Sequence, residues 1–167
     1  MNALVHKRKA DRDFPPAGKA LMDRVEVEFP EEDGVDGRPV RALLVDGSPA
    51  VLKTLNLLLQ QHSGLLVIGT AMDGYHAVRR VVELEPDLVL MDLRLPEMNG
   101  LEATRQIKSR PHAPAVIMVS ADDTPECRAA ASVAGTDGFV GKQHMFAQLP
   151  AAIRKLFPKT TLLSSVT

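Results

Sequence analysis

Four polar side chains of this sequence follow short apolar runs and form a chemically coherent set. They are Asp46, Asp92, Ser120 and Lys142. Two carboxylates favour a hard cation such as Mg²⁺, which typically keeps several waters and takes only one or two protein carboxylates together with phosphate. A phosphoryl group arriving at Asp92 would be held by that ion, by the Lys142 ammonium and by the Ser120 hydroxyl. Phosphoryl transfer requires charge neutralisation of this kind.

These side chains can meet only if the runs before them are strands of one parallel sheet. From Pro39 onward, short aliphatic runs alternate with longer stretches of helical period, which is typical of a parallel sheet covered by helices. The carboxyl ends of such strands lie at one edge of the sheet, where open α/β sheets carry their chemistry. We therefore predict a doubly wound α/β fold (flavodoxin-like) with a five-stranded parallel sheet and helices on both faces.

The individual elements are predicted from run length and period. Asp92 ends an apolar run and begins a turn-rich loop that reaches Gly100. Ser48 and Pro49 fit the start of the first helix, as its N-cap and its first helical residue. The expected strands are 40–45, 65–71, 88–91, 115–119 and 138–140. The first expected helix begins at Pro49, and the other four span about 75–84, 101–109, 125–134 and 145–156.

Composition limits the class of protein. The chain has 167 residues, is 45% hydrophobic and 25% charged, and carries a formal net charge of −1, which fits one globular domain. This charge gives no overall attraction to nucleic acid or to an anionic membrane. No run approaches the roughly 18 apolar residues of a membrane span. Cys127 is the single cysteine and cannot form an internal disulfide, and the amino terminus turns charged too early for a secretory signal, so we expect a cytoplasmic protein.

Three segments are expected along the chain. Residues 1–38 show no sustained period and are rich in proline, glycine and charge, which predicts a flexible or irregular extension. Within it, 25–29 alternates like a short strand, and the basic stretch at 7–12 is more typical of a solvated arm than of a binding site. Residues 39–157 form the predicted domain. The tail at 158–167 is too short for a helix-turn-helix or an enzymatic effector, so the domain is expected to stand alone unless the sequence is part of a longer protein.

From about 39 to 157 the chain resembles the receiver domain of two-component response regulators, which has a CheY-like fold. The resemblance rests on four segments in the family's order: 43–46, 86–100, 119–121 and 134–142. It implies that Asp92 is the nucleophile that accepts a phosphoryl group from a histidine kinase or a phosphotransfer protein. It also implies that Lys142 and Ser120 respond to that group, and that Phe139 occupies the aromatic switch position.

The metal site departs from the family pattern. Receivers usually carry two adjacent acidic residues after the first strand, whereas Asp46 is followed here by Gly47. The ligands that the resemblance still implies are Asp46, Asp92 and the backbone carbonyl of Arg94, so Mg²⁺ binding should be weakened. The Arg94 side chain is expected to point into solvent more readily than over the pocket. Gln143 stands where many receivers have proline, so no cis bond is expected there.

The remaining polar residues are predicted to have structural roles. Asp122 and Asp123 should cap the helix near Pro125, because aspartate is preferred at helix amino termini. The five histidines show no metal-ligand spacing, which predicts surface or capping positions. Cys127, on the same helix as Pro125, should be a small buried apolar residue.

Two hypotheses about function follow. The first is a single-domain response regulator that accepts a phosphoryl group and signals to a downstream protein. The resemblance implies that this partner binds the fourth helix, fifth strand and fifth helix, about 124–156. The second is a degenerate receiver that acts as an interaction module without phosphorylation, which Gly47 supports.

An enzyme that forms an aspartyl-phosphate on external substrates is disfavoured, because 92–94 lacks the second aspartate that would serve as general acid. We therefore expect no enzymatic activity of this kind and no DNA-binding domain. The oligomeric state stays open.

Overall fold

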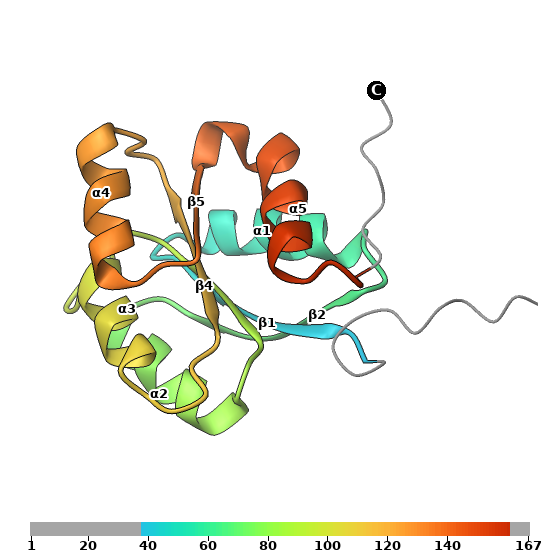
Figure 1. Cartoon of the computed structure of the whole chain (residues 1–167), viewed down its shortest axis with the longest axis horizontal. Helices are drawn as coiled ribbons and strands as arrows, with labels where there is room; N and C mark the ends of the chain where they lie inside the picture. Colours follow the sequence, from blue (N-terminus) through green and yellow to red (C-terminus); the bar gives the residue numbers. More distant parts are fainter. Residues whose placement is uncertain (1–37, 161–167) are drawn as a thin grey trace, which may run out of the picture.

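The apolar runs form one parallel sheet in the computed structural model, which describes residues 38–160 (Figure 1). The strands lie in the order β2-β1-β3-β4-β5, and every neighbouring pair is parallel. Their bounds are β1 Val40–Val45, β2 Leu65–Ala71, β3 Leu88–Met91, β4 Ala115–Ser120 and β5 Gly138–Gly141. The predicted five-stranded sheet is confirmed, with β4 and β5 each one residue longer than expected.

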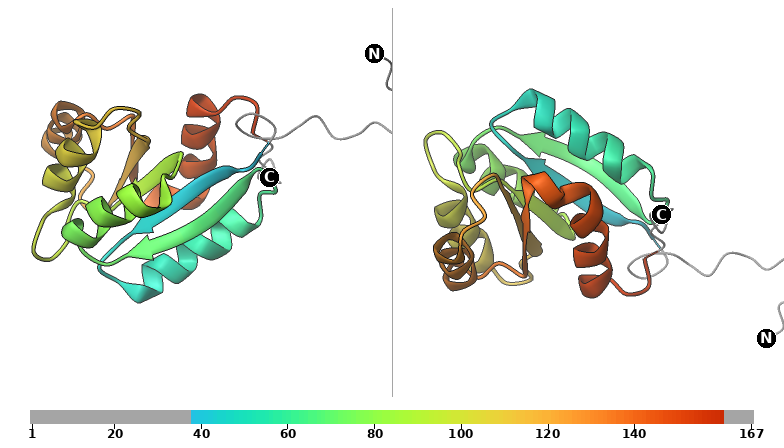
Figure 2. Two further views of the ribbon diagram at one scale, coloured as in Figure 1. Left: turned by 90° about the horizontal axis from the view of Figure 1, so that it is seen from below. Right: turned by 90° about the horizontal axis from the view of Figure 1, so that it is seen from above.

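Helices cover both faces of this sheet, as the doubly wound fold requires (Figure 2). Their bounds are α1 Pro49–Gln60, α2 Gly74–Leu84, α3 Gly100–Lys108, α4 Pro125–Ala134 and α5 Met145–Leu156, with a 3₁₀ turn, η1, at Lys142–His144. α1 and α5 pack with strand residues into one apolar cluster, and α2, α3 and α4 contribute to a second cluster. The longest helices of the described region have 12 residues, so none could cross a bilayer.

β3 is the central strand and is buried along its whole length. Leu88, Val89, Leu90 and Met91 are each 0% exposed. A parallel strand that is covered by helices on both faces has a continuous apolar run instead of an alternating one, which explains the sequence pattern. Because β3 is also paired with β1 and β4 on its two edges, the position of the residue that follows it is fixed.

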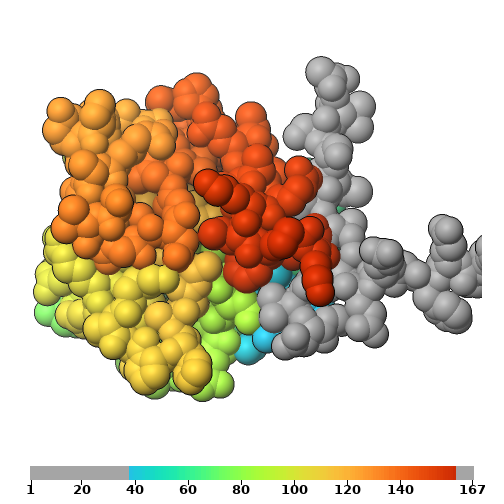
Figure 3. Space-filling model, in the orientation of Figure 1, coloured from blue at the N-terminus to red at the C-terminus, as the bar shows by residue number. Residues whose placement is uncertain are grey.

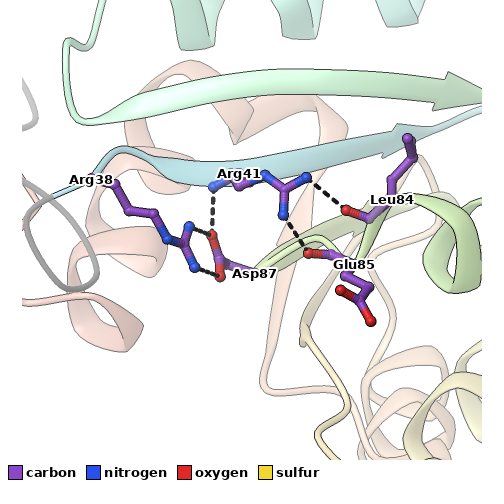
Figure 4. Close-up of polar contacts among 5 residues, drawn as sticks. All are labelled: Arg38, Arg41, Leu84, Glu85 and Asp87. Carbon is purple, nitrogen blue, oxygen red and sulfur yellow. Dashed lines mark hydrogen bonds and ion pairs between the residues drawn. The ribbon is translucent and has the colours of Figure 1, made fainter.

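A polar network joins the amino ends of β1 and β3 to α2 (Figure 4). Asp87 precedes β3, and its Oδ2 accepts hydrogen bonds from Arg38 Nη1 at 2.7 Å and from the Arg41 backbone N–H at 2.8 Å. The Arg41 guanidinium donates to the carbonyl oxygens of Leu84 at 2.7 Å and Glu85 at 2.9 Å. Burial alone would raise the pKa of Asp87, but the bonds from Arg38 and Arg41 outweigh it and lower the pKa.

Three predictions about single residues are wrong. Thr124 caps α4, where Asp122 and Asp123 were expected to do so, and its hydroxyl accepts from the Cys127 N–H at 3.2 Å. The two aspartates are ion-paired with arginines instead. Cys127 is half-buried and not fully buried, and His62 lies inside the protein at 5% exposure.

The predictions for the extension, including the strand at 25–29, and for the tail from 161 onward fall outside the described residues.

Replacing Asp87 tests the network at the amino ends. Asp87→Asn should lower the free energy of unfolding at neutral pH by about 1.5–3 kcal/mol, the range for hydrogen bonds to a charged group. Because the pKa of Asp87 is lowered in the folded protein, its stabilising effect is present above the pKa of the unfolded chain and is lost as the pH falls through the folded value.

Urea unfolding from neutral to acidic pH should therefore show the difference between wild type and Asp87→Asn shrinking with acid. Glu85→Gln, which changes an exposed acid of the same turn, is the control. An equal loss of stability in both variants, or a difference that does not depend on pH, would contradict the role of Asp87.

Candidate functional site

The carboxyl ends of four strands bring the polar set to one edge of the sheet. Asp46 follows β1 and Asp92 follows β3, and the Asp92 N–H donates to the carbonyl of Val45 at 2.8 Å. Ser120 is the last residue of β4, and Lys142 follows β5. Asp46 is 2% exposed, Asp92 6% and Ser120 1%. The residues predicted to meet thus lie at the same edge, and three of them are buried.

Lys142 joins the two carboxylates. Its Nζ lies 2.6 Å from Asp46 Oδ2 and 3.2 Å from Asp92 Oδ1. Asp46 Oδ1 accepts a hydrogen bond from the Ser48 N–H at 2.8 Å. Ser48 has the predicted N-cap position of α1, but its side chain makes no capping hydrogen bond. Two buried acids therefore share one ammonium, which can balance only one of their two negative charges.

Burial and charge act against each other on the pKa values of this cluster. Burial raises the pKa of Asp92, and the nearby Asp46 raises it further, although Lys142 and the backbone N–H of Arg94 partly offset the rise. Burial lowers the pKa of Lys142, but the hydrogen bond to Asp46 and the charge of Asp92 outweigh it and raise the pKa. Lys142 is therefore charged at neutral pH, and Asp92 is a more basic carboxylate than an exposed aspartate.

Ser120 and Phe139 lie on adjacent strands beside this cluster. Ser120 Oγ accepts a hydrogen bond from the Asp122 N–H at 3.1 Å. Within residues 38–160 no hydrogen bond joins Ser120 to Asp92. Phe139 lies in β5, half-buried, and the guanidinium carbon of Arg128 lies 4.7 Å from the centroid of its ring. Their switch roles remain predictions, and the structure supplies their positions.

Arg94 is mostly exposed, as expected, but it has a partner. Its side chain is 77% exposed, and its Nη2 forms an ion pair with Asp122 Oδ2. This pair links the loop after β3 to the loop after β4. In the described part of the chain the guanidinium makes no bond to either buried carboxylate. This pair could not be predicted from the sequence, because an acid just before a helix fits a capping role equally well.

Asp46 and Asp92 are the acids available to bind Mg²⁺. Among the described residues, no three His, Cys, Asp or Glu side chains are grouped to hold a metal ion. Two carboxylates still suit Mg²⁺, because this ion usually keeps several waters. At Gly47 an added Cβ would come no closer than 3.6 Å to Pro96 Cδ and 3.8 Å to the Met72 carbonyl oxygen. The surroundings of Gly47 thus leave room for a Cβ, and the residue itself adds no acid to Asp46 and Asp92.

The acidity of Asp92 can be measured directly. In carboxyl-detected NMR, Asp92 should titrate above its ordinary value of 3.8, because it is buried beside Asp46. Lys142→Met should raise the pKa of Asp92 further, because it removes the ammonium that favours the charged form. Lys155→Met, at an exposed lysine of α5, should leave it unchanged. A wild-type pKa at or below 3.8, or no response to Lys142→Met, would contradict this description of the cluster.

Comparison with known proteins places this geometry in a family. The model of the response regulator receiver domain matches residues 42–154. The protein-glutamate methylesterase/protein-glutamine glutaminase 2 of Koribacter versatilis is 43% identical over 90 residues, which are 54% of this chain and 24% of that protein. The transcriptional regulatory protein YdfI of Bacillus subtilis is 44% identical over 80 residues, which are 48% of this chain and 38% of that protein. The matched part is thus well under half of either relative.

Solved structures agree with the family match. The response regulator domain of Thermotoga maritima CheB is 31% identical with a TM-score of 0.64, covering 71% of this chain and 94% of that one. CheY in the CheX-CheY-BeF3-Mg²⁺ complex from Borrelia burgdorferi gives 26% identity and a TM-score of 0.67, covering 72% and 90%. The family model covers more than half of the chain, and the five-stranded parallel sheet with its helices agrees with the fold of these solved receiver domains. The chain therefore belongs to the response regulator receiver domains of two-component systems.

Proposed function

We propose that this receiver accepts a phosphoryl group on Asp92 from the phosphohistidine of a histidine kinase or phosphotransfer protein. The main support is the Asp92 carboxylate itself, buried at the end of β3 with Lys142 Nζ 3.2 Å from its Oδ1. Burial makes ionised Asp92 less favourable, as its raised pKa indicates. Such perturbed acids concentrate at functional sites, because reacting groups need pKa values that are matched to their task.

The proposed reaction is an in-line displacement at phosphorus. An Asp92 carboxylate oxygen forms the new P–O bond, and the P–N bond of the phosphohistidine breaks with the electron pair leaving on the imidazole. The Lys142 ammonium lies close enough to balance charge on the transferred group, and the Ser120 hydroxyl is a further donor at the same edge. Mg²⁺ bound by Asp46, Asp92 and the Arg94 carbonyl would supply additional charge neutralisation.

The signal is proposed to leave through the surface formed by α4, β5 and α5, to a downstream protein. Figure 3 shows α4 and α5 on the same face of the molecule. Val133 on α4 is 80% exposed and Phe146 on α5 is 58% exposed, so this surface offers apolar contacts. Lys142 lies between β5 and α5 and connects this surface to the acid cluster. A partner that prefers one arrangement of the surface would read the state of Asp92.

A second candidate is a receiver that binds its partner without phosphorylation. Gly47 favours it, because one carboxylate fewer is available for the cation that phosphoryl transfer uses. The two candidates share the fold and the interaction surface, and they differ in whether Asp92 reacts.

Phosphorylation separates the two candidates. The full chain, incubated with acetyl phosphate across a Mg²⁺ series, should gain the mass of one phosphoryl group, and Asp92→Asn should gain none. Glu97→Gln, at an exposed acid of the same loop, should be modified like the wild type. If Asp92 stays unmodified at high Mg²⁺ and with a phosphorylated kinase partner, the phosphoacceptor proposal is wrong and the second candidate stands.

Adding an acid at position 47 tests whether the missing carboxylate weakens Mg²⁺ binding. Gly47→Asp should tighten Mg²⁺ by about tenfold, which equals about 1.4 kcal/mol, because it adds a negative ligand where space is open. Gly47→Asn has nearly the same shape without the charge, and it should change the affinity much less. Mg²⁺ titration followed by NMR shifts of the Asp92 loop measures both variants. Equal affinities for the aspartate and asparagine variants would count against a missing carboxylate as the cause.

A further inference from the structure

Arg128 on α4 contacts groups on two other segments of the fold. Its Nε lies 2.6 Å from Asp123 Oδ1, and its Nη2 lies 2.9 Å from Asp123 Oδ2. Its guanidinium carbon lies 4.7 Å from the centroid of the Phe139 ring. The first contact is a bidentate ion pair, and the second has the distance of a cation–π interaction. One guanidinium therefore links the loop after β4 to the aromatic residue of β5.

Asp123 in turn packs against the end of β5. A Cβ added at Gly141 would lie 2.6 Å from Asp123 Oδ2, so this carboxylate fills the space above Gly141. Gly141 pairs with Ser120 and directly precedes Lys142. The hydrogen bond from Arg128 is the main reason that the pKa of Asp123 is lowered. The carboxylate that Arg128 positions is thus in contact with the strand end that carries Lys142.

The loop after β4 also has a bond to Ser120. Ser120 Oγ accepts the N–H of Asp122, the residue before Asp123. If the Ser120 hydroxyl moves toward a phosphoryl group on Asp92, it leaves this N–H, which removes a restraint on 121–123. Asp123 cannot move without changing its bidentate pair with Arg128. A movement that begins at Ser120 can therefore reach the guanidinium through two contacts, the hydrogen bond between Ser120 and Asp122 and the ion pair between Asp123 and Arg128.

We propose that Arg128 is the positioning residue that couples the loop after β4 to Phe139, and that it stabilises the arrangement seen in this structure. The inference rests on the proposed function, because it names how phosphorylation at Asp92 would change the α4–β5–α5 surface. While the ion pair is intact, Asp123 and the Phe139 ring both contact the Arg128 guanidinium, which holds them in a fixed position relative to each other. When the loop moves, the ring loses that contact, so the two groups change together.

Binding of the phosphoryl mimic BeF3⁻ with Mg²⁺ to the full chain tests this inference. Arg128→Ala removes contacts that exist in the unmodified arrangement, so it should tighten mimic binding by about fivefold or more, the lower end of typical coupling between sites. Asp123→Asn should act in the same direction, and Arg128→Lys should restore part of the wild-type behaviour. Arg105→Ala, at an exposed arginine of α3, is the control and should have no effect.

A double-mutant cycle identifies the residue through which Arg128 acts. The effects of Arg128→Ala and Phe139→Leu on mimic affinity should be non-additive, because each removes the same contact. If Arg128→Ala lowers only the free energy of unfolding and leaves mimic affinity within twofold of wild type, Arg128 is a structural residue and the inference is wrong.

A measurement without any phosphoryl mimic tests the coupling through Arg128 separately from the phosphorylation of Asp92. In the unmodified protein, Ser120→Ala should shift the NMR signals of the Phe139 ring, and it should no longer do so in the Arg128→Ala background. If the wild type binds no mimic but this difference appears, the coupling is present and the phosphoacceptor proposal fails alone. If Ser120→Ala shifts the ring equally in both backgrounds, or in neither, Arg128 does not couple them.

Discussion

The ammonium of Lys142 is shared by two carboxylates, at 2.6 Å from Asp46 and 3.2 Å from Asp92. Burying two acids beside a single cation is unfavourable, because one ammonium only partly replaces the solvation that two carboxylates lose when they leave water. The protein tolerates the cost because Asp46 also accepts a backbone N–H and because both acids lie at the ends of paired strands. The cluster retains a net negative charge, which suits it to receive a further cation.

Gly47 changes the balance of this cluster without changing its shape. The loop after β1 has room for a Cβ at Gly47 and gives this residue no positive φ, so the backbone there does not demand glycine. The protein keeps the groups that would contact a phosphoryl group and has one carboxylate fewer for a metal ion. Electrostatic attraction between Mg²⁺ and its ligands scales with their number and charge. The expected effect of glycine at position 47 is therefore a lower affinity for Mg²⁺. Under the proposed function, Gly47 would weaken the metal site while Asp92 keeps its place at the end of β3.

The sequence was sufficient for the parts of the structure that depend on periodicity. The sheet, the bounds of α4 and α5 and the meeting of Asp46, Asp92 and Lys142 all follow from apolar runs and from the rule that parallel strands end at one edge. The ion pairs of Asp122 and Asp123 did not follow. An aspartate before a helix caps it or pairs with an arginine according to side-chain geometry, and a threonine at 124 took the capping role.

The hydrogen bond between the Arg41 N–H and Asp87 joins residues 46 positions apart in the chain. β1 is the first strand of the described residues. Its place beside β3 requires that the chain between them, which holds α1, β2 and α2, close into a loop. Closing such a loop costs chain entropy before the contacts compensate for it, and contacts of long sequence separation slow folding. Asp46 and Asp92 follow these same two strands. We therefore expect the acid pair to form only when the whole β1–β3 pairing forms, so that partly folded chains lack it.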